Sequence, residues 1–146
     1  MTIALEQAVT VAAPPETVWH LLVDVPAWKT WWPDCLDAHA RDHKSLREGS
    51  DLEVLLQPKQ QKLTLRPFVD LYTESRTLSL THRSFSLAGT VTWQLQPGPT
   101  GTRVTGRMVL QGLLPFFLKL FRQDDIARFI LHANLRGLKK MAERMG

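Results

Sequence analysis

Residues 11–34, VAAPPETVWHLLVDVPAWKTWWPD, decide the fold prediction. They follow a stretch over 3–12 with near-alternating apolar residues, which predicts a first strand with one buried face. The proline pair after this strand suits the first turn of a helix, where proline loses no hydrogen bond. Apolar residues at helical spacing from Val18 onward then predict a short amphipathic helix that ends near Asp24.

A second short helix is predicted over 27–32, because Pro26 interrupts the first helix and Pro33 stops the second. This segment holds three tryptophans, whose large apolar rings favour burial. We therefore expect the two short helices to cover part of a hydrophobic core.

The middle of the chain changes to a period of two, which is typical of strands. Turn-rich breaks separate strands that we expect over 36–42, 51–57, 62–73, 76–83, 86–96 and 102–111. Strands joined by short breaks form hairpins, so the sheet is expected to be antiparallel. Pro67 inside one of these runs implies an edge position or a bulge.

The last part of the chain returns to helical spacing and predicts one long amphipathic helix over 115–145. Asp124 or Asp125 would alternatively cap a fresh helix and leave 115–122 as a separate segment. The length of 146 residues is typical of a single domain, and we expect one domain over 1–146. Seven strands and one long helix bury their apolar faces when a curved sheet wraps around the helix, which leaves a cavity between them.

Two segments carry a family resemblance: residues 11–34 and GTVTWQLQPGPTGTRVTGRMVLQG at 89–112. Together they resemble the START-like (SRPBCC) superfamily, and within it the polyketide cyclase/dehydrase-related branch. The resemblance implies an α+β helix-grip fold and a cavity shared by lipid carriers, aromatase/cyclases and coenzyme-Q-binding proteins. The coenzyme-Q-binding group is the alternative branch, through Asp24-Val25 and Trp32-Pro33-Asp34-Cys35.

The side chains expected to bind a ligand come from the inner sheet face, the terminal helix and the short helices. Strand alternation selects the sheet residues, and helical spacing selects the opposing wall. Aromatic and thioether groups around a concave site suit a flat or lipid-like molecule. The set is Trp28, Trp32, Leu80, His82, Trp93, Met108, Phe117, Phe121, Phe129, Ile130 and Ala133, each of which would also be explained as ordinary core.

His82 is the leading candidate catalytic residue, because a buried polar group needs a partner that a ligand would supply. Arg66 and Tyr72 are further candidates, because an edge position or a bulge at Pro67 would aim their side chains differently. The imidazole of His82 would donate a hydrogen bond to a ligand carbonyl or transfer a proton near neutral pH. The alternative for all three is a structural hydrogen bond or exposure to solvent. His132 and Asn134 are predicted on the exposed side of the terminal helix.

No metal site or cofactor is predicted. His39 and His43, in a strand and the loop after it, are not expected on one face. The single cysteine, Cys35, is expected to be an inert apolar residue. No secretion signal or stretch of membrane-spanning length is recognisable, so the cytoplasm is the expected compartment.

A net charge of +4 with basic residues toward the C-terminus is read as a solvated helix face, and no nucleic acid partner is expected. The leading functional hypothesis is binding of a hydrophobic small molecule: a lipid, a quinone or a polyketide-like compound. The alternatives are a cyclase or dehydratase for an aromatic or polyketide-like substrate, a coenzyme-Q-type carrier, and a protein that contacts membrane surfaces transiently.

Overall fold

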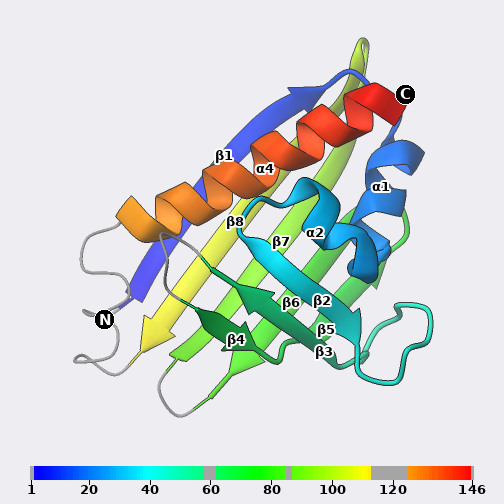
Figure 1. Ribbon diagram of the computed structural model, residues 1–146. Coiled ribbons are helices and arrows are strands. Elements are labelled where there is room, and N and C mark those ends of the chain that lie inside the picture. The colour runs from blue at the N-terminus through cyan, green and yellow to red at the C-terminus, as the bar shows by residue number, and fades with distance from the viewer. Residues whose placement is uncertain (1, 58–61, 85–86, 113–124, 146) are drawn as a thin grey trace.

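A computed structural model describes residues 2–57, 62–84, 87–112 and 125–145 (Figure 1). The fold is of the α+β class: most elements are strands, and the last element is a long helix. In order they are β1 (Thr2–Val11), α1 (Pro15–Val23), the 3-10 turn η1 (Val25–Ala27), α2 (Trp28–Trp31), β2 (Cys35–Ala40), β3 (Leu52–Leu56), β4 (Leu63–Leu65), β5 (Phe68–Thr73), β6 (Thr77–Arg83), β7 (Leu87–Gly98), β8 (Gly101–Gly112) and α4 (Asp125–Met145).

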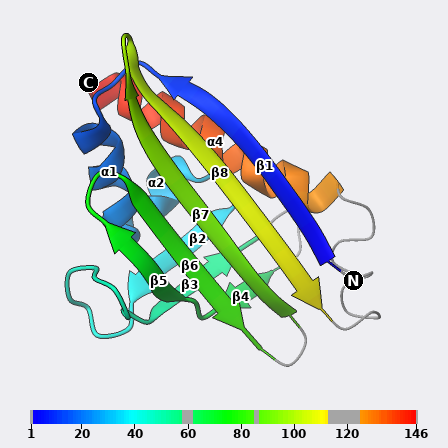
Figure 2. The ribbon, with the colours of Figure 1, turned by 180° about the vertical axis from the view of Figure 1, so that it is seen from behind.

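The strands form two antiparallel sheets. The larger has the order β1-β8-β7-β6-β5, and the smaller has the order β2-β3-β4. Figure 2, seen from behind, shows the large sheet in front of α4, so α4 and the small sheet lie on the same side of it. This arrangement confirms the predicted helix-grip fold of class α+β, with the helix held against a curved antiparallel sheet.

The strand count differs from the predicted seven, because the run 62–73 is two strands rather than one. The break falls at Pro67, which has no N–H to donate to a continuous ladder. Its carbonyl instead accepts from the N–H of Leu52 at 2.8 Å, and the N–H of Val69 donates to the carbonyl of Ser50 at 2.8 Å. These bonds join the start of β5 to the start of β3, so the two sheets meet at this corner.

The long helix is described from Asp125 to Met145. The predicted part over 115–124, and with it the choice between one helix and two, lies outside the described residues. In the described part of the chain, no helix is long and apolar enough to span a membrane.

Tryptophans join the short helices to the sheet. Trp28 is fully buried, and its ring centroid lies 5.7 Å from that of Trp32 and 6.0 Å from that of Trp93 on β7. The Nε1–H of Trp28 donates to the carbonyl of Leu22 at 3.0 Å, which anchors α2 to the end of α1. The predicted role of the short helices as a cover over the core is confirmed at this end of the sheet.

Two glycines let α4 approach its neighbours closely. A Cβ at Gly106 on β8 would stand 3.0 Å from Leu131 and 3.2 Å from Leu135, both fully buried on α4. A Cβ at Gly137 on α4 would overlap the carbonyl oxygen of Trp31 in α2. Because glycine has no Cβ at these two positions, α4 packs closely against both the sheet and the short helices.

Candidate functional site

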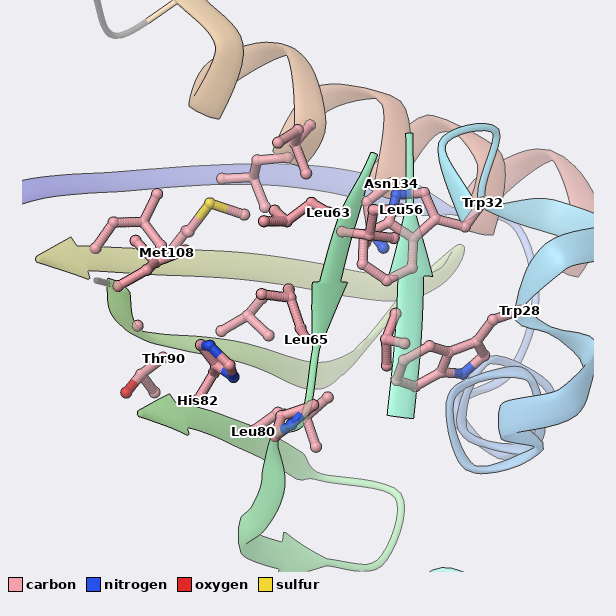
Figure 3. Close-up of a pocket in the computed structure, with 18 residues that line it drawn as sticks. Trp28, Trp32, Leu56, Leu63, Leu65, Leu80, His82, Thr90, Met108 and Asn134 are labelled. Atoms are coloured by element: carbon pink, nitrogen blue, oxygen red, sulfur yellow. The ribbon is translucent and has the colours of Figure 1, made fainter. Parts of the chain in front are cut away.

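A pocket of about 90 Å³ lies between the large sheet, the small sheet and α4 (Figure 3). Its sheet wall includes Leu80 on β6, Val91 on β7 and Met108 on β8. The strand register pairs Leu80 with Val91 and Val91 with Met108, so these side chains are neighbours on one face. The period-two pattern of three successive strands thus builds one continuous apolar surface.

The opposite wall combines short elements with the long helix. Leu56 on β3 and Leu63 on β4 come from the small sheet, and Ile130 and Leu131 come from α4. Trp28 is the first residue of α2, and Trp32 directly follows that helix. Pro67, Leu87 and Leu110 are among the further residues that line the pocket, so its wall is almost wholly apolar.

Six of the predicted ligand-binding residues line this pocket. They come from the large sheet, from α2 and the residue after it, and from α4, and Figure 3 labels all of them except Ile130. They are Trp28, Trp32, Leu80, His82, Met108 and Ile130. Sequence reasoning therefore brought together residues that are far apart in the chain and meet at one place in the fold.

Three predicted residues lie elsewhere, and two lie outside the described residues. Trp93 is fully buried in the core, Ala133 is half-buried beside the pocket-facing stripe of α4, and Phe129 is 42% exposed. The residues of α4 that line the pocket are at 130, 131 and 134. Positions 129 and 133 each precede one of them by one residue, so the turn of the helix points their side chains away from the pocket. Phe117 and Phe121 are the two that the structure does not describe.

His82 lines the pocket and is held by a backbone hydrogen bond. Its Nδ1 accepts from the N–H of Arg66 at 3.1 Å, which assigns the ring proton of the neutral form to Nε2. Burial lowers the pKa of His82 below its ordinary value of 6.5, and the hydrogen bond from Arg66 opposes this only in part. The imidazole is therefore neutral at pH 7 and has one N–H to offer.

The other two catalytic candidates do not reach the pocket. The guanidinium of Arg66 is exposed and pairs with Glu53, with Nε 3.3 Å from Oε2. Tyr72 packs edge-on against Trp19 on α1, with ring centroids 5.2 Å apart. Neither side chain is among the described residues that line this pocket, so a catalytic role for either stays a prediction without a contact to support it.

Asn134 is the polar pocket residue that sequence reasoning placed wrongly. Predicted on the exposed side of the helix, it is 2% exposed and lines the pocket. Its Oδ1 accepts from Nε1–H of Trp93 at 2.9 Å, across α4 and β7. The available signal was its position four residues after Ile130 and four before Leu138, in the middle of the apolar stripe.

A second, more polar pocket of about 430 Å³ lies near the end of α1 and includes His20, His39, His43 and Tyr72. The rings of His39 and His43 are stacked, with centroids 5.5 Å apart. The expectation that these two histidines would not share a face is therefore wrong. Among the residues that the structure describes, no group of three or more histidine, cysteine or acidic side chains is arranged to hold a metal ion.

Buried Cys35 matches its predicted apolar role. Its side chain is 5% exposed, and burial raises the pKa of the thiol to about 11, with further help from the charge of Asp37. A thiol of this kind is protonated at neutral pH and a poor nucleophile.

Comparison with known proteins places this fold and pocket in context. In structure, the chain is similar to the Zhui aromatase/cyclase of a Streptomyces species, with a TM-score of 0.83, 15% identity, and coverage of 99% of this chain and 95% of that one. It is also similar to a START superfamily protein from Mycobacterium smegmatis, with a TM-score of 0.77, 17% identity, and coverage of 98% and 99%.

A protein from Thermus thermophilus is similar as well, with a TM-score of 0.79, 18% identity, and coverage of 100% of this chain and 99% of that one. At such identities these likenesses show the fold alone. No curated protein matches the chain significantly. The sequence profile of the family described as polyketide cyclase / dehydrase and lipid transport matches residues 2–146, and the chain therefore belongs to that family, as its START-like segments predicted.

Proposed function

We propose that this protein binds a neutral hydrophobic small molecule in the pocket beneath α4. The observation that carries the proposal is the wall itself, where apolar side chains from two sheets and two helices line one pocket. Pockets of this composition gain binding free energy by removing apolar ligand surface from water. Lipids, quinones and polyketide-like compounds are the ligand classes that we infer, and the cytoplasm stays the predicted compartment.

The size of the pocket limits what it accepts without rearrangement. A cavity of about 150 Å³ takes benzene, whereas this pocket is about 90 Å³. Met108 in the wall is unbranched and adapts its shape readily. We therefore expect one small ring, or the ring-sized end of a larger ligand, to enter with a modest shift of the wall.

A neutral hydrocarbon ring, methylenecyclohexane, provides the test. Titrated into ¹⁵N-labelled protein, it should shift the amide signals of Leu80, Val91 and Met108 in a saturable way. The variant Val91→Phe places an aromatic ring inside the pocket and should abolish this response. Thr92→Phe is the matched control, since Thr92 hydrogen-bonds Ser79 across the strand pair on the other face of the sheet.

Two results would contradict the proposal. One is the absence of saturable shifts in wild-type protein, and the other is an equal response in Val91→Phe. Native mass spectrometry of protein purified without denaturation adds an independent measurement, because a retained endogenous ligand would appear as a fixed mass increment that Val91→Phe loses.

A cyclase or dehydratase activity is the second candidate, and a single observation favours it. His82 is at the pocket wall with Nδ1 occupied by the N–H of Arg66, so its Nε2–H is the group that would stabilise an enolate by donating to its oxygen. An enzyme of this kind would keep methylenecyclohexane binding in His82→Gln and lose turnover of a poly-β-ketone substrate. Unchanged turnover in His82→Gln would remove the basis for this candidate.

A further inference from the structure

Asn134 brings an unused hydrogen-bond donor to the pocket. The indole nitrogen of Trp93 is only a donor, so the amide atom that faces it at 2.9 Å is the oxygen, Oδ1. This contact fixes the orientation of the amide and directs Nδ2 away from Trp93. Nδ2 is buried and has no hydrogen-bond partner among the described residues.

Trp32 brings a second donor of the same kind. Its ring lines the pocket, the residue is 6% exposed, and Nε1 is buried without an acceptor among the described residues. Figure 3 shows Trp32 and Asn134 on the α4 side of the pocket. Trp28, in the same wall, differs because its Nε1–H is already bonded to the carbonyl of Leu22.

Two further polar side chains of the pocket, His82 and Thr90, hydrogen-bond within the protein. Nδ1 of His82 is occupied by the N–H of Arg66, and the hydroxyl of Thr90 is bonded to that of Thr81 at 3.2 Å. Among the described residues that line the pocket there is no Asp, Glu, Lys or Arg. The apolar wall of the pocket thus contains two buried N–H groups without partners, and the described residues that line it include no charged side chain to balance them.

We propose that the ligand is neutral and carries an acceptor oxygen of the carbonyl type, which Asn134 Nδ2 and Trp32 Nε1 bind at the α4 side of the pocket. This inference rests on the proposed function and adds which ligand chemistry the pocket selects. A buried donor without a partner is unfavourable, and a ligand oxygen would satisfy it. A carboxylate is disfavoured because no cation accompanies it in the apolar wall.

The test compares ligands that differ only in this oxygen. Cyclohexanone and methylenecyclohexane have nearly the same shape, and cyclohexanecarboxylate adds a charge. Because the ketone is better hydrated in water, the informative quantity is the ratio of ketone to hydrocarbon affinity, compared between proteins. Trp32→Phe keeps an aromatic wall and removes the N–H, so this ratio should fall by about three- to ten-fold.

Trp28→Phe is the matched control, since it removes the same amount of ring from the same wall and a donor that is already used. It should change the affinities for ketone and hydrocarbon by the same factor. Asn134→Leu should lower the ratio as Trp32→Phe does. If that variant does not fold, the Trp32→Phe ratio decides.

The indole N–H proton of Trp32, assigned by its loss in Trp32→Phe, provides a direct signature. It should move downfield with cyclohexanone and remain in place with methylenecyclohexane, while cyclohexanecarboxylate should not bind. An unchanged affinity ratio in Trp32→Phe would overturn the inference and leave hydrocarbon binding, and so the proposed function, intact. Failure of every probe to bind would overturn both.

Discussion

Substitution of Gly137 by alanine tests the contact that closes the pocket. An added Cβ would overlap the carbonyl oxygen of Trp31 and would lie 3.0 Å from the carbonyl carbon of that residue and 3.2 Å from Cδ of Pro33. The obstacle is backbone, which has no rotamer through which to escape, so α4 and α2 must separate. Without this contact, alanine would stabilise the helix by about 1 kcal/mol relative to glycine.

The sign of the stability change therefore decides between the two effects. Overpacking costs about 1–3 kcal/mol, and the upper value applies where backbone has to move. Setting about 3 kcal/mol against a gain of about 1 kcal/mol leaves a net loss of about 2 kcal/mol. For a chain of this length the melting temperature should fall by about 4–8 °C.

Urea and thermal unfolding followed by circular dichroism measure this loss. The pair Arg136→Ala and Arg136→Gly, at the exposed neighbouring position of α4, calibrates the helix propensity difference without the clash. Since Trp28 and Trp32 belong to the displaced segment, Gly137→Ala should also weaken methylenecyclohexane binding. A Gly137→Ala protein that is as stable as the wild type, or more so, would refute the proposed close contact between the two helices.

Two further predictions concern titratable groups outside the pocket. Cys35 should react with the disulfide reagent DTNB only after unfolding, because burial raises the pKa of its thiol to about 11, and rapid reaction of the folded protein at mildly alkaline pH would contradict its burial. The carboxylate of Glu143 accepts from Lys139 at 2.8 Å and from the N–H of Ala12 at 2.9 Å, and these bonds lower its pKa below the ordinary 4.5. A carboxylate whose pKa is lower in the folded than in the unfolded protein stabilises the fold at pH values above its unfolded-state pKa, and this contribution is lost as the pH falls through its folded-state pKa. The urea midpoint should therefore drop more below about pH 4.5 in the wild type than in Glu143→Gln. Parallel pH profiles for the two proteins would show that the contacts of Glu143 do not contribute.

Sequence alternation predicted the sheet wall of the pocket well. Leu80 and Met108 are on the inner face because a one-residue shift would have turned every apolar side chain of their strands to solvent. Alternation assigns the face but not the depth along the strand. Trp93 shares the inner face with Val91, two residues away, yet it packs into the tryptophan cluster instead of the pocket.

The helix wall was predicted less well, because the apolar stripe of α4 is wide. Ile130 and Phe129 are both apolar neighbours, and which of them faces the pocket depends on the rotation of the helix against the sheet. That rotation is set by the glycines at 106 and 137, whose contacts become visible only in the folded structure. The small sheet was also missed as a separate wall, since β4 is only Leu63–Leu65 and the pattern on either side of Pro67 looks continuous.

The two donors of the pocket do not carry equal weight as evidence for a ligand. Asn134 has a sufficient structural reason to be present, because the buried N–H of Trp93 needs an acceptor and asparagine is a neutral residue that supplies one. Its Nδ2 then follows from the chemistry of the amide. The N–H of Trp32 bonds to nothing among the described residues, so the structural contribution visible there is the packing of its ring against Trp28 and Trp31.

A phenylalanine at this position would line the same wall without a buried, unsatisfied donor, whose cost is about 1–3 kcal/mol. If Trp32 served packing alone, Trp32→Phe would stabilise the free protein once the lost ring area is allowed for, and would leave the preference between ligands unchanged. If it serves recognition, the same variant lowers the ratio of ketone to hydrocarbon affinity by about three- to ten-fold. The ligand ratio in Trp32→Phe, with Trp28→Phe beside it, therefore separates a role in recognition from a role in packing.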